Sequence, residues 1–182
     1  MPATRDQIAT EFRDLVLRYG YRRAAVEDVA RALRISKKTI YELFPSKQEL
    51  YRYAVELWAR EQRRHVESLL TAPTATGRVE QTVAIAFADA RRGFSASPYH
   101  DETEPPEIVN DVNAQVFAPM LRDLIEQGNA SGELHVDDPE MTAAFLVALG
   151  TEAVRRLRDD PESGAEAAAL AAARRLLVGV VE

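Results

Sequence analysis

The sequence predicts an all-α protein with an N-terminal three-helix head and a longer helical body, about nine helices in all. Three observations predict this class. Apolar residues recur every three to four positions along most of the 182 residues, helix-capping residues precede these runs, and strand-type alternation never persists. A chain of this length can bury a sizeable core. We expect one domain over residues 1–46 and a second over residues 47–182.

Three helices are expected in the head. The first follows a capping box at Thr4–Gln7, in which two side chains satisfy backbone N–H groups, and it ends at Gly20. The second covers about residues 26–33. The third covers about residues 37–44, after the capping hydroxyl of Ser36. This third helix is expected to be the second helix of a helix-turn-helix.

The body is expected to be helical with short interruptions. A capping box at Ser46 opens a long helix that ends before Pro73 and Gly77. Three prolines make residues 95–106 an expected loop. A fifth helix is expected to end near residue 94. Residues 107–128 are expected to form one or two helices interrupted at Pro119. Two further helices are expected to cover residues 139–158 and 163–181.

Charge is distributed unevenly along the chain. The net charge of −6 divides into +4 for residues 1–60 and −10 for residues 61–182. All three lysines, Lys37, Lys38 and Lys47, lie within eleven residues. A basic head on an acidic body is the asymmetry expected when one end of a protein meets nucleic acid. A solvated helical face is the alternative interpretation of the charge alone.

The third helix of the head divides its residues between two faces. Ile40 and Phe44 are four positions apart and share the inner face. Lys37, Lys38, Thr39 and Tyr41 project elsewhere and offer ammonium and hydroxyl groups beside free backbone N–H groups. Such a surface suits phosphates and base edges in a major groove.

A series of motifs follows in order along the head: Gly20-Tyr21, Val26-Glu27-Asp28-Val29-Ala30, Ile35-Ser36-Lys37-Lys38-Thr39-Ile40-Tyr41, Phe44 and Ser46-Lys47-Gln48-Glu49-Leu50. With these motifs, residues 5–58 resemble the DNA-binding head of the tetracycline-repressor (TetR) family of bacterial transcription regulators. The rest of the chain resembles the family only as a string of helices of about the right number and length. In this family that part is the ligand-binding and dimerising body.

The resemblance implies a set of DNA-contacting residues. Lys37, Lys38 and Thr39 would approach bases or backbone beside the cap Ser36, and Tyr41 would contact a phosphate. Lys47 would contact a second phosphate, and it lies in the first turn of a helix, where the dipole also favours an anion. Each residue has a plainer alternative: Tyr41 as a half-buried core aromatic, Lys47 as a solvated lysine, and Thr39 as a cap.

Four positions depart from the family pattern. Ala24 and Ala25 replace the hydroxyl residues usual ahead of the second helix, which removes a cap worth about 0.5–2 kcal/mol. Arg34 stands where the turn usually has glycine, so a left-handed backbone there would cost on the order of 1 kcal/mol. The Arg34 guanidinium is a compensating phosphate contact in this interpretation. Leu43 replaces a polar residue that often faces DNA.

The body offers candidates for a small-molecule pocket and for a dimer interface. The pocket would be mainly apolar with few polar anchors, although for any single candidate a place in the core is the favoured interpretation. A dimer is favoured because helices that are apolar on several faces need covering on several faces, and a two-fold axis suits a palindromic site. A monomeric bundle core is the alternative. The pocket candidates are Trp58, Phe87, Arg91, Phe94, Tyr99, Phe117, Met120, Leu121, Met141 and Phe145, and the interface candidates are Leu149, Val154, Leu157, Leu170, Ala173 and Leu177.

The sequence favours a binding protein over an enzyme. It has no cysteine, no His-Glu-x-x-His motif and no Glu-x-x-His repeat, so we expect no catalytic residues, no metal and no cofactor. No apolar stretch reaches the roughly 18–20 residues that span a bilayer, and the start of the chain is polar, so we expect a cytoplasmic protein.

The expected function is a dimeric, ligand-responsive transcriptional regulator. A repressor that a small molecule releases from a palindromic operator is favoured over an activator. Two alternatives stay open: a constitutive DNA-binding helical protein without an effector, and an enzyme with a helical body. A sizeable closed cavity in the body would argue against the constitutive protein, whereas an acid–base pair in a cleft would favour the enzyme.

Overall fold

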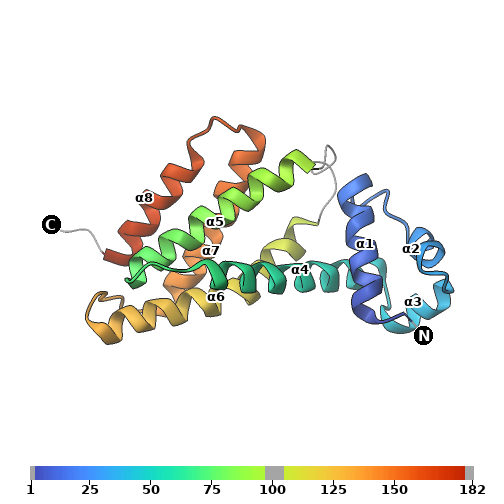
Figure 1. Ribbon diagram of the computed structural model, residues 1–182, viewed down its shortest axis with the longest axis horizontal. Helices are drawn as coiled ribbons and strands as arrows, with labels where there is room; N and C mark the ends of the chain where they lie inside the picture. Colours follow the sequence, from blue (N-terminus) through green and yellow to red (C-terminus); the bar gives the residue numbers. More distant parts are fainter. Residues whose placement is uncertain (1–2, 97–104, 179–182) are drawn as a thin grey trace. The chain divides into compact units, whose positions relative to one another are not determined.

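The computed structural model describes residues 3–96 and 105–178, without the side chains of residues 92–96 and 106, and the described chain is all-helical (Figure 1). This confirms the predicted fold class. The described helices are α1 (Arg5–Tyr19), α2 (Val26–Leu33), α3 (Lys37–Leu43), α4 (Lys47–Leu69), α5 (Ala75–Ala96), α6 (Pro106–Ser131), α7 (Pro139–Asp159) and α8 (Ala165–Val178).

The described residues form eight helices rather than about nine, because α6 is not interrupted at Pro119. Proline removes one backbone hydrogen-bond donor from the helix. The next two side chains, Met120 and Leu121, are both buried in the core, and their packing holds this part of the chain in the helix. The expected loop over residues 95–106 is also shorter, since α5 extends to Ala96. Residues 97–104 lie outside the described residues.

The chain clusters into two compact units that divide within α4 and within α6. The first unit holds the chain up to Glu61 together with the first turns of α6, as far as Val112. The second unit holds residues 62–94 and continues from Asn113 through α7 and α8. The predicted domain boundary at residues 46–47 stays a prediction.

In the first unit, local capping sets where the helices begin. Thr4 and Gln7 form the predicted capping box of α1. The hydroxyls of Ser36 and Ser46 accept the backbone N–H groups of Thr39 and Glu49, each at 3.0 Å, and so start α3 and α4. The residues that these helices bury form the core of the unit, among them Ile8, Phe12, Val29, Ile40, Phe44 and Leu50.

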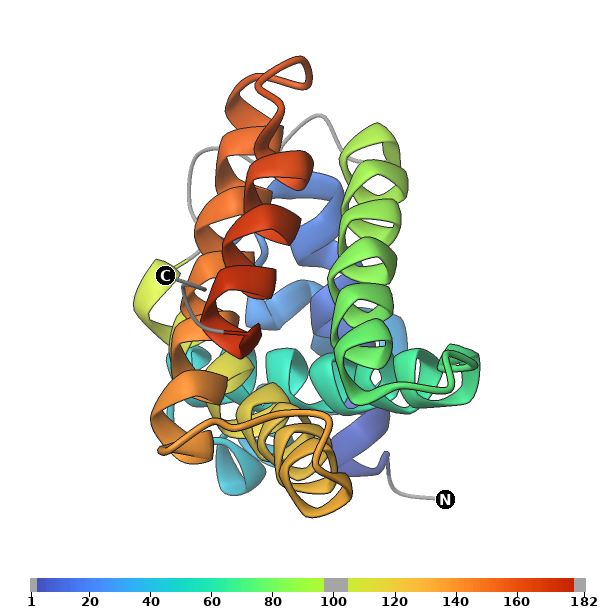
Figure 2. The same ribbon diagram turned by 90° about the vertical axis from the view of Figure 1, so that its left-hand side faces the viewer.

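The second unit has two apolar clusters. One gathers residues of α4 to α8 around Val79 and Ile125, both fully buried. The other joins Phe87 of α5 to the facing sides of α7 and α8, which run side by side (Figure 2). Ion pairs at the surface link α5 to α8 at both ends of this contact, from Arg174 to Glu80 and from Arg91 to Glu166.

The connection from α6 to α7 packs against the start of α5. Gly128 allows this approach, because a Cβ there would lie 2.5 Å from Leu134 Cδ1 and 2.9 Å from Ala75 Cβ. The carboxylate of Glu133 accepts the backbone N–H groups of Ala75 and Thr76 at 2.7 and 2.9 Å. These hydrogen bonds lower the pKa of Glu133 and cap α5 from another segment of the chain.

None of the helices in the described part of the chain is long and apolar enough to cross a membrane.

Candidate nucleic-acid interface

The two ends of α2 have the local features that the sequence predicts. Ala25 precedes α2 and supplies no side-chain cap. Arg34 ends α2 in the left-handed region, with φ 54° and ψ 40°, and the next N–H donates back to the carbonyl of Ala30 at 2.9 Å. Glycine adopts this conformation at little cost, so the arginine keeps a strained backbone there.

The two lysines at the start of α3 differ in their partners. Lys37 Nζ lies 2.6 Å from Oε1 of Glu27 on α2, so this ammonium is held across the helix-turn-helix. Lys38 Nζ lies 3.9 Å from Oε1 of Glu42 one turn along α3, and its side chain is 87% exposed. Lys38 therefore reaches further into solvent than Lys37 does.

The hydroxyl residues of α3 also differ in exposure. Tyr41 is 46% exposed, so the phosphate contact and the half-buried core aromatic both stay predictions for this residue. Ser36 and Thr39 share a hydrogen bond of 2.9 Å between their hydroxyls, and Ser36 also caps the helix. Thr39 is thus part of the cap, whereas Tyr41 is an exposed residue of α3.

Lys47 is anchored at the first turn of α4. Its ammonium donates to the carbonyl oxygen of Arg22 at 3.3 Å and lies 4.6 Å from the centre of the Tyr21 ring. Partial burial lowers the pKa of Lys47. The side chain is therefore oriented by the turn before α2 rather than freely solvated. The ammonium has three donors, so this contact leaves capacity for a phosphate.

Sequence reasoning missed Glu27 as part of this surface. The hydrogen bond from Lys37 is the main cause that lowers the pKa of Glu27, and the charge of Lys47 lowers it further. A carboxylate therefore lies among the lysines expected to meet DNA. Its position in the family-like motif before Ala30 was visible in the sequence, but its pairing with Lys37 depends on the angle between α2 and α3.

The candidate pocket residues divide between core and surface. Phe87, Met120 and Leu121 are buried, and Phe117 packs partly buried against the same core. Arg91 pairs with Glu166. The side chain of Phe94 and all of Tyr99 lie outside the described residues. The candidates at the surface are Trp58, Met141 and Phe145, which are 41%, 51% and 53% exposed.

Two open recesses lie in the second unit. One, of about 290 Å³, is lined by residues of α4, α5 and α6 and includes one pocket candidate, Met120. The other, of about 400 Å³, lies beside the α6–α7 connection and the end of α8, and its lining includes none of the candidates. Among the described residues, no group of three or more His, Asp or Glu side chains is placed so that it could hold a metal ion.

The interface candidates also divide. Leu157, Ala173 and Leu177 lie in the chain's own core, at 5% exposure or less, so they are not available to a partner. Leu149, Val154 and Leu170 are half-buried. The exposed apolar residues of α7 instead form a stripe that we call the α7 face: Met141, Ala144, Phe145 and Ala148.

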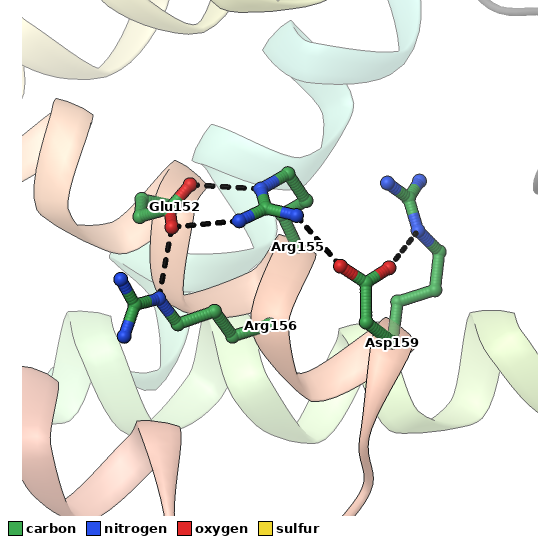
Figure 3. A network of polar contacts seen from close by, with 5 residues as sticks. Glu152, Arg155, Arg156 and Asp159 are labelled. Atoms are coloured by element: carbon green, nitrogen blue, oxygen red, sulfur yellow. Dashed lines mark hydrogen bonds and ion pairs between the residues drawn. The ribbon is translucent and has the colours of Figure 1, made fainter. Parts of the chain in front are cut away.

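The α7 face continues into a charged network at the end of the helix (Figure 3). Arg155 donates two hydrogen bonds to Glu152, at 2.8 and 2.9 Å, and a third to Asp159 at 2.6 Å. Arg156 donates to Glu152 at 2.8 Å. The hydrogen bonds from Arg155 and then Arg156 lower the pKa of Glu152 to about 2. These charges satisfy one another within α7.

Comparison with known proteins identifies the head. Residues 13–54 match the profile of a family described as bacterial regulatory proteins, tetR family. No curated protein matches the chain.

Solved structures share the fold of the whole chain. A bacterial regulatory protein in the tetR family from Rhodococcus RHA1 is 20% identical with a TM-score of 0.58, and the match covers 98% of each chain. FadR from Bacillus subtilis in complex with stearoyl-CoA is 16% identical with a TM-score of 0.67, covering 96% of this chain and 98% of that one. RolR in complex with resorcinol is 15% identical with a TM-score of 0.76, covering 96% and 87%.

Proposed function

Because its head places the chain in the tetR family of bacterial regulatory proteins, we propose that it is a repressor released from a palindromic operator by a small molecule. The observation that carries the DNA-binding part is the basic surface formed by α3 and the start of α4. Lys38 and Tyr41 are exposed on this surface. Lys37 is paired with a carboxylate of α2, and Lys47 donates a hydrogen bond to a backbone carbonyl.

The proposal gives each residue of this surface a role. α3 enters the major groove, where Lys37, Lys38 and Thr39 meet bases or backbone and Ser36 fixes the helix start. Tyr41 and Lys47 each contact a phosphate. Arg34 adds a further phosphate contact from the end of α2. No step in this function requires a catalytic group, so the proposal assigns no enzymatic activity.

A second copy of the chain is the proposed partner of the α7 face. Phe145 and Met141 are each about half exposed, and the small side chains of Ala144 and Ala148 beside them let another helix come close. Two alanines of α8, Ala167 and Ala171, are exposed as well. Two heads related by a two-fold axis would read two half-sites one helical turn of DNA apart or a multiple of it.

A small organic effector is proposed for the body. Two of the structures with this fold hold resorcinol and stearoyl-CoA, which differ widely in size. These two compounds are therefore the first probes to test on this chain. A constitutive DNA-binding protein is the second candidate. It is favoured by the described body, where Phe87, Met120 and Leu121 are buried, Phe117 is partly buried and both recesses are open.

The proposed function is tested by finding the operator and then removing one anchored charge. Genomic footprinting supplies the bound sites, and a duplex carrying the site supplies the affinity. We expect Lys47→Ala to weaken binding and to flatten the log–log salt dependence by about one unit per lost phosphate contact. Unchanged affinity and unchanged salt slope would show that the DNA surface is placed wrongly.

A further inference from the structure

Glu27 lies inside the surface that the proposed function assigns to DNA. Its Oε1 accepts a hydrogen bond of 2.6 Å from Lys37 Nζ, and both side chains are about half exposed. Glu27 is in the first turn of α2, whereas Lys37 opens α3. The pair therefore bridges the two helices of the helix-turn-helix rather than stabilising one of them.

This arrangement puts a carboxylate in competition with DNA. A phosphate and a carboxylate bind the same ammonium through the same charge-assisted hydrogen bond. An exposed pair of this kind is worth little in water, so a phosphate from DNA can displace it. Lys38 offers the contrast, because its pair with Glu42 at 3.9 Å is too long for a hydrogen bond.

We propose that Glu27 is a built-in competitor of DNA for Lys37. It holds the ammonium in the DNA-free head and must give it up when a phosphate docks. The inference rests on the proposed DNA-binding function. Its consequence is weaker binding to DNA of any sequence, because binding that ignores sequence depends almost entirely on phosphate contacts.

The experiment measures binding of the full chain to a mixed-sequence duplex of about 30 base pairs, long enough for two half-sites a helical turn apart. Glu27→Gln keeps the shape of the side chain and removes its charge. We expect this variant to bind about two- to fivefold more tightly per docked head, since an exposed ion pair no longer opposes docking. The log–log salt slope should steepen by up to about 0.9 per head.

A double-mutant cycle tests whether Glu27 acts through Lys37. In a Lys37→Ala background, Glu27→Gln should lose more than half of its effect on affinity. Glu56→Gln is the matched control, because Glu56 forms an ion pair with Arg60 within α4 and its loss removes the same single charge. The control should change the affinity by less than half as much as Glu27→Gln. Circular dichroism and thermal melting establish that each variant is folded.

Three results would overturn the inference. Glu27→Gln that binds no more tightly than the unaltered chain would show that Glu27 does not compete, and weaker binding would show that it positions Lys37 for DNA instead. An undiminished effect in the Lys37→Ala background would show repulsion of DNA at long range without competition for Lys37. If the unaltered chain binds no duplex even at low salt, the proposed function itself fails.

Discussion

Arg34 combines a strained backbone with a candidate phosphate contact. Its φ of 54° is the left-handed conformation that glycine adopts freely, and its side chain is exposed. Arg34→Gly removes the strain, so we expect the free energy of unfolding to rise by about 0.5–1 kcal/mol. Urea denaturation measures this change. The same variant should bind operator DNA more weakly, because it loses a charge.

Arg34→Ala separates the two effects. Alanine keeps the Cβ and therefore the strain, but it lacks the guanidinium. It should bind DNA as weakly as Arg34→Gly without the gain in stability. A glycine variant that is less stable than the alanine variant would show that the left-handed residue carries no net strain, and equal DNA binding by all three chains would remove Arg34 from the interface.

At the level of elements, the packing of α6 depends on one glycine. Glycine inside a helix normally costs about 1 kcal/mol relative to alanine. At Gly128 a methyl group would collide with the buried Leu134 and with Ala75 at the start of α5. We expect Gly128→Ala to lower the free energy of unfolding by about 1–3 kcal/mol, because overpacking outweighs helix propensity.

Gly150 is the matched control for this prediction. It also lies inside a helix, α7, but a Cβ there would have nothing within 4 Å. Gly150→Ala should therefore raise the free energy of unfolding by about 0.5–1 kcal/mol. Chemical denaturation of both variants gives the comparison. Two changes of the same sign would show that the close approach at Gly128 does not control the stability of the body.

The α7 face leads to a prediction about assembly. Phe145 is 53% exposed, so replacing it by arginine leaves the core of the chain intact. If a second copy covers this face, Phe145→Arg forces an unpaired charge into an apolar interface and should produce monomers. Sedimentation at micromolar concentration measures the change. An unaltered chain that is already monomeric would refute the proposed dimer.

Core substitutions on α8 cannot replace that experiment. Leu177 is 2% exposed within its own chain, so an arginine there would unfold the body whether or not a dimer forms. Ala144→Arg is a second test on the α7 face itself, one residue from Phe145. Both surface variants should keep the helical content of the unaltered chain.

Comparison of these elements shows which features could be predicted from sequence. Helix starts depend on local chemistry, so the caps at Thr4, Ser36 and Ser46 were predicted and are confirmed. The left-handed backbone at Arg34 was also expected, because the family that the head resembles usually has glycine at this position. These features involve only neighbours in the sequence.

Features that depend on distant partners were not predicted. Alanine-rich helices such as α8 are apolar on several faces, so periodicity alone does not select the buried one. Leu177 therefore became an interface candidate although it packs inside its own chain, and Phe145 became a pocket candidate although it is exposed. The pair between Glu27 and Lys37 likewise needs the position of α2 against α3.

At the scale of the whole molecule, α4 and α6 each contribute residues to both compact units. α4 begins at the proposed phosphate contact Lys47 and continues into the body. α6 carries Asp111 in the first unit, and Arg52 of α4 donates a hydrogen bond to it. Further along, α6 contributes Ile125 to the core of the second unit. Two continuous helices therefore join the units, and we propose that they couple effector binding in the body to the head.

The last prediction concerns this coupling. If an effector displaces α4 or α6, it binds the free chain more tightly than the DNA-bound chain. Reciprocity then requires operator DNA to weaken effector binding by the same factor, typically about 5–150-fold. Asp111→Asn removes the charge that links α6 to α4. We therefore expect a smaller factor between effector affinity without and with operator DNA, while the effector alone and the operator alone bind nearly as before.

Calorimetric titration measures the factor, using a compound that raises the melting temperature of the unaltered chain. The compound is titrated with and without operator duplex, into the unaltered chain and into Asp111→Asn. Asp123→Asn is the control. Asp123 pairs with Arg122 within α6, and this substitution removes one negative charge as Asp111→Asn does. It should leave the factor unchanged. An operator affinity that is identical with and without saturating compound would end the repressor proposal and favour the constitutive DNA-binding protein.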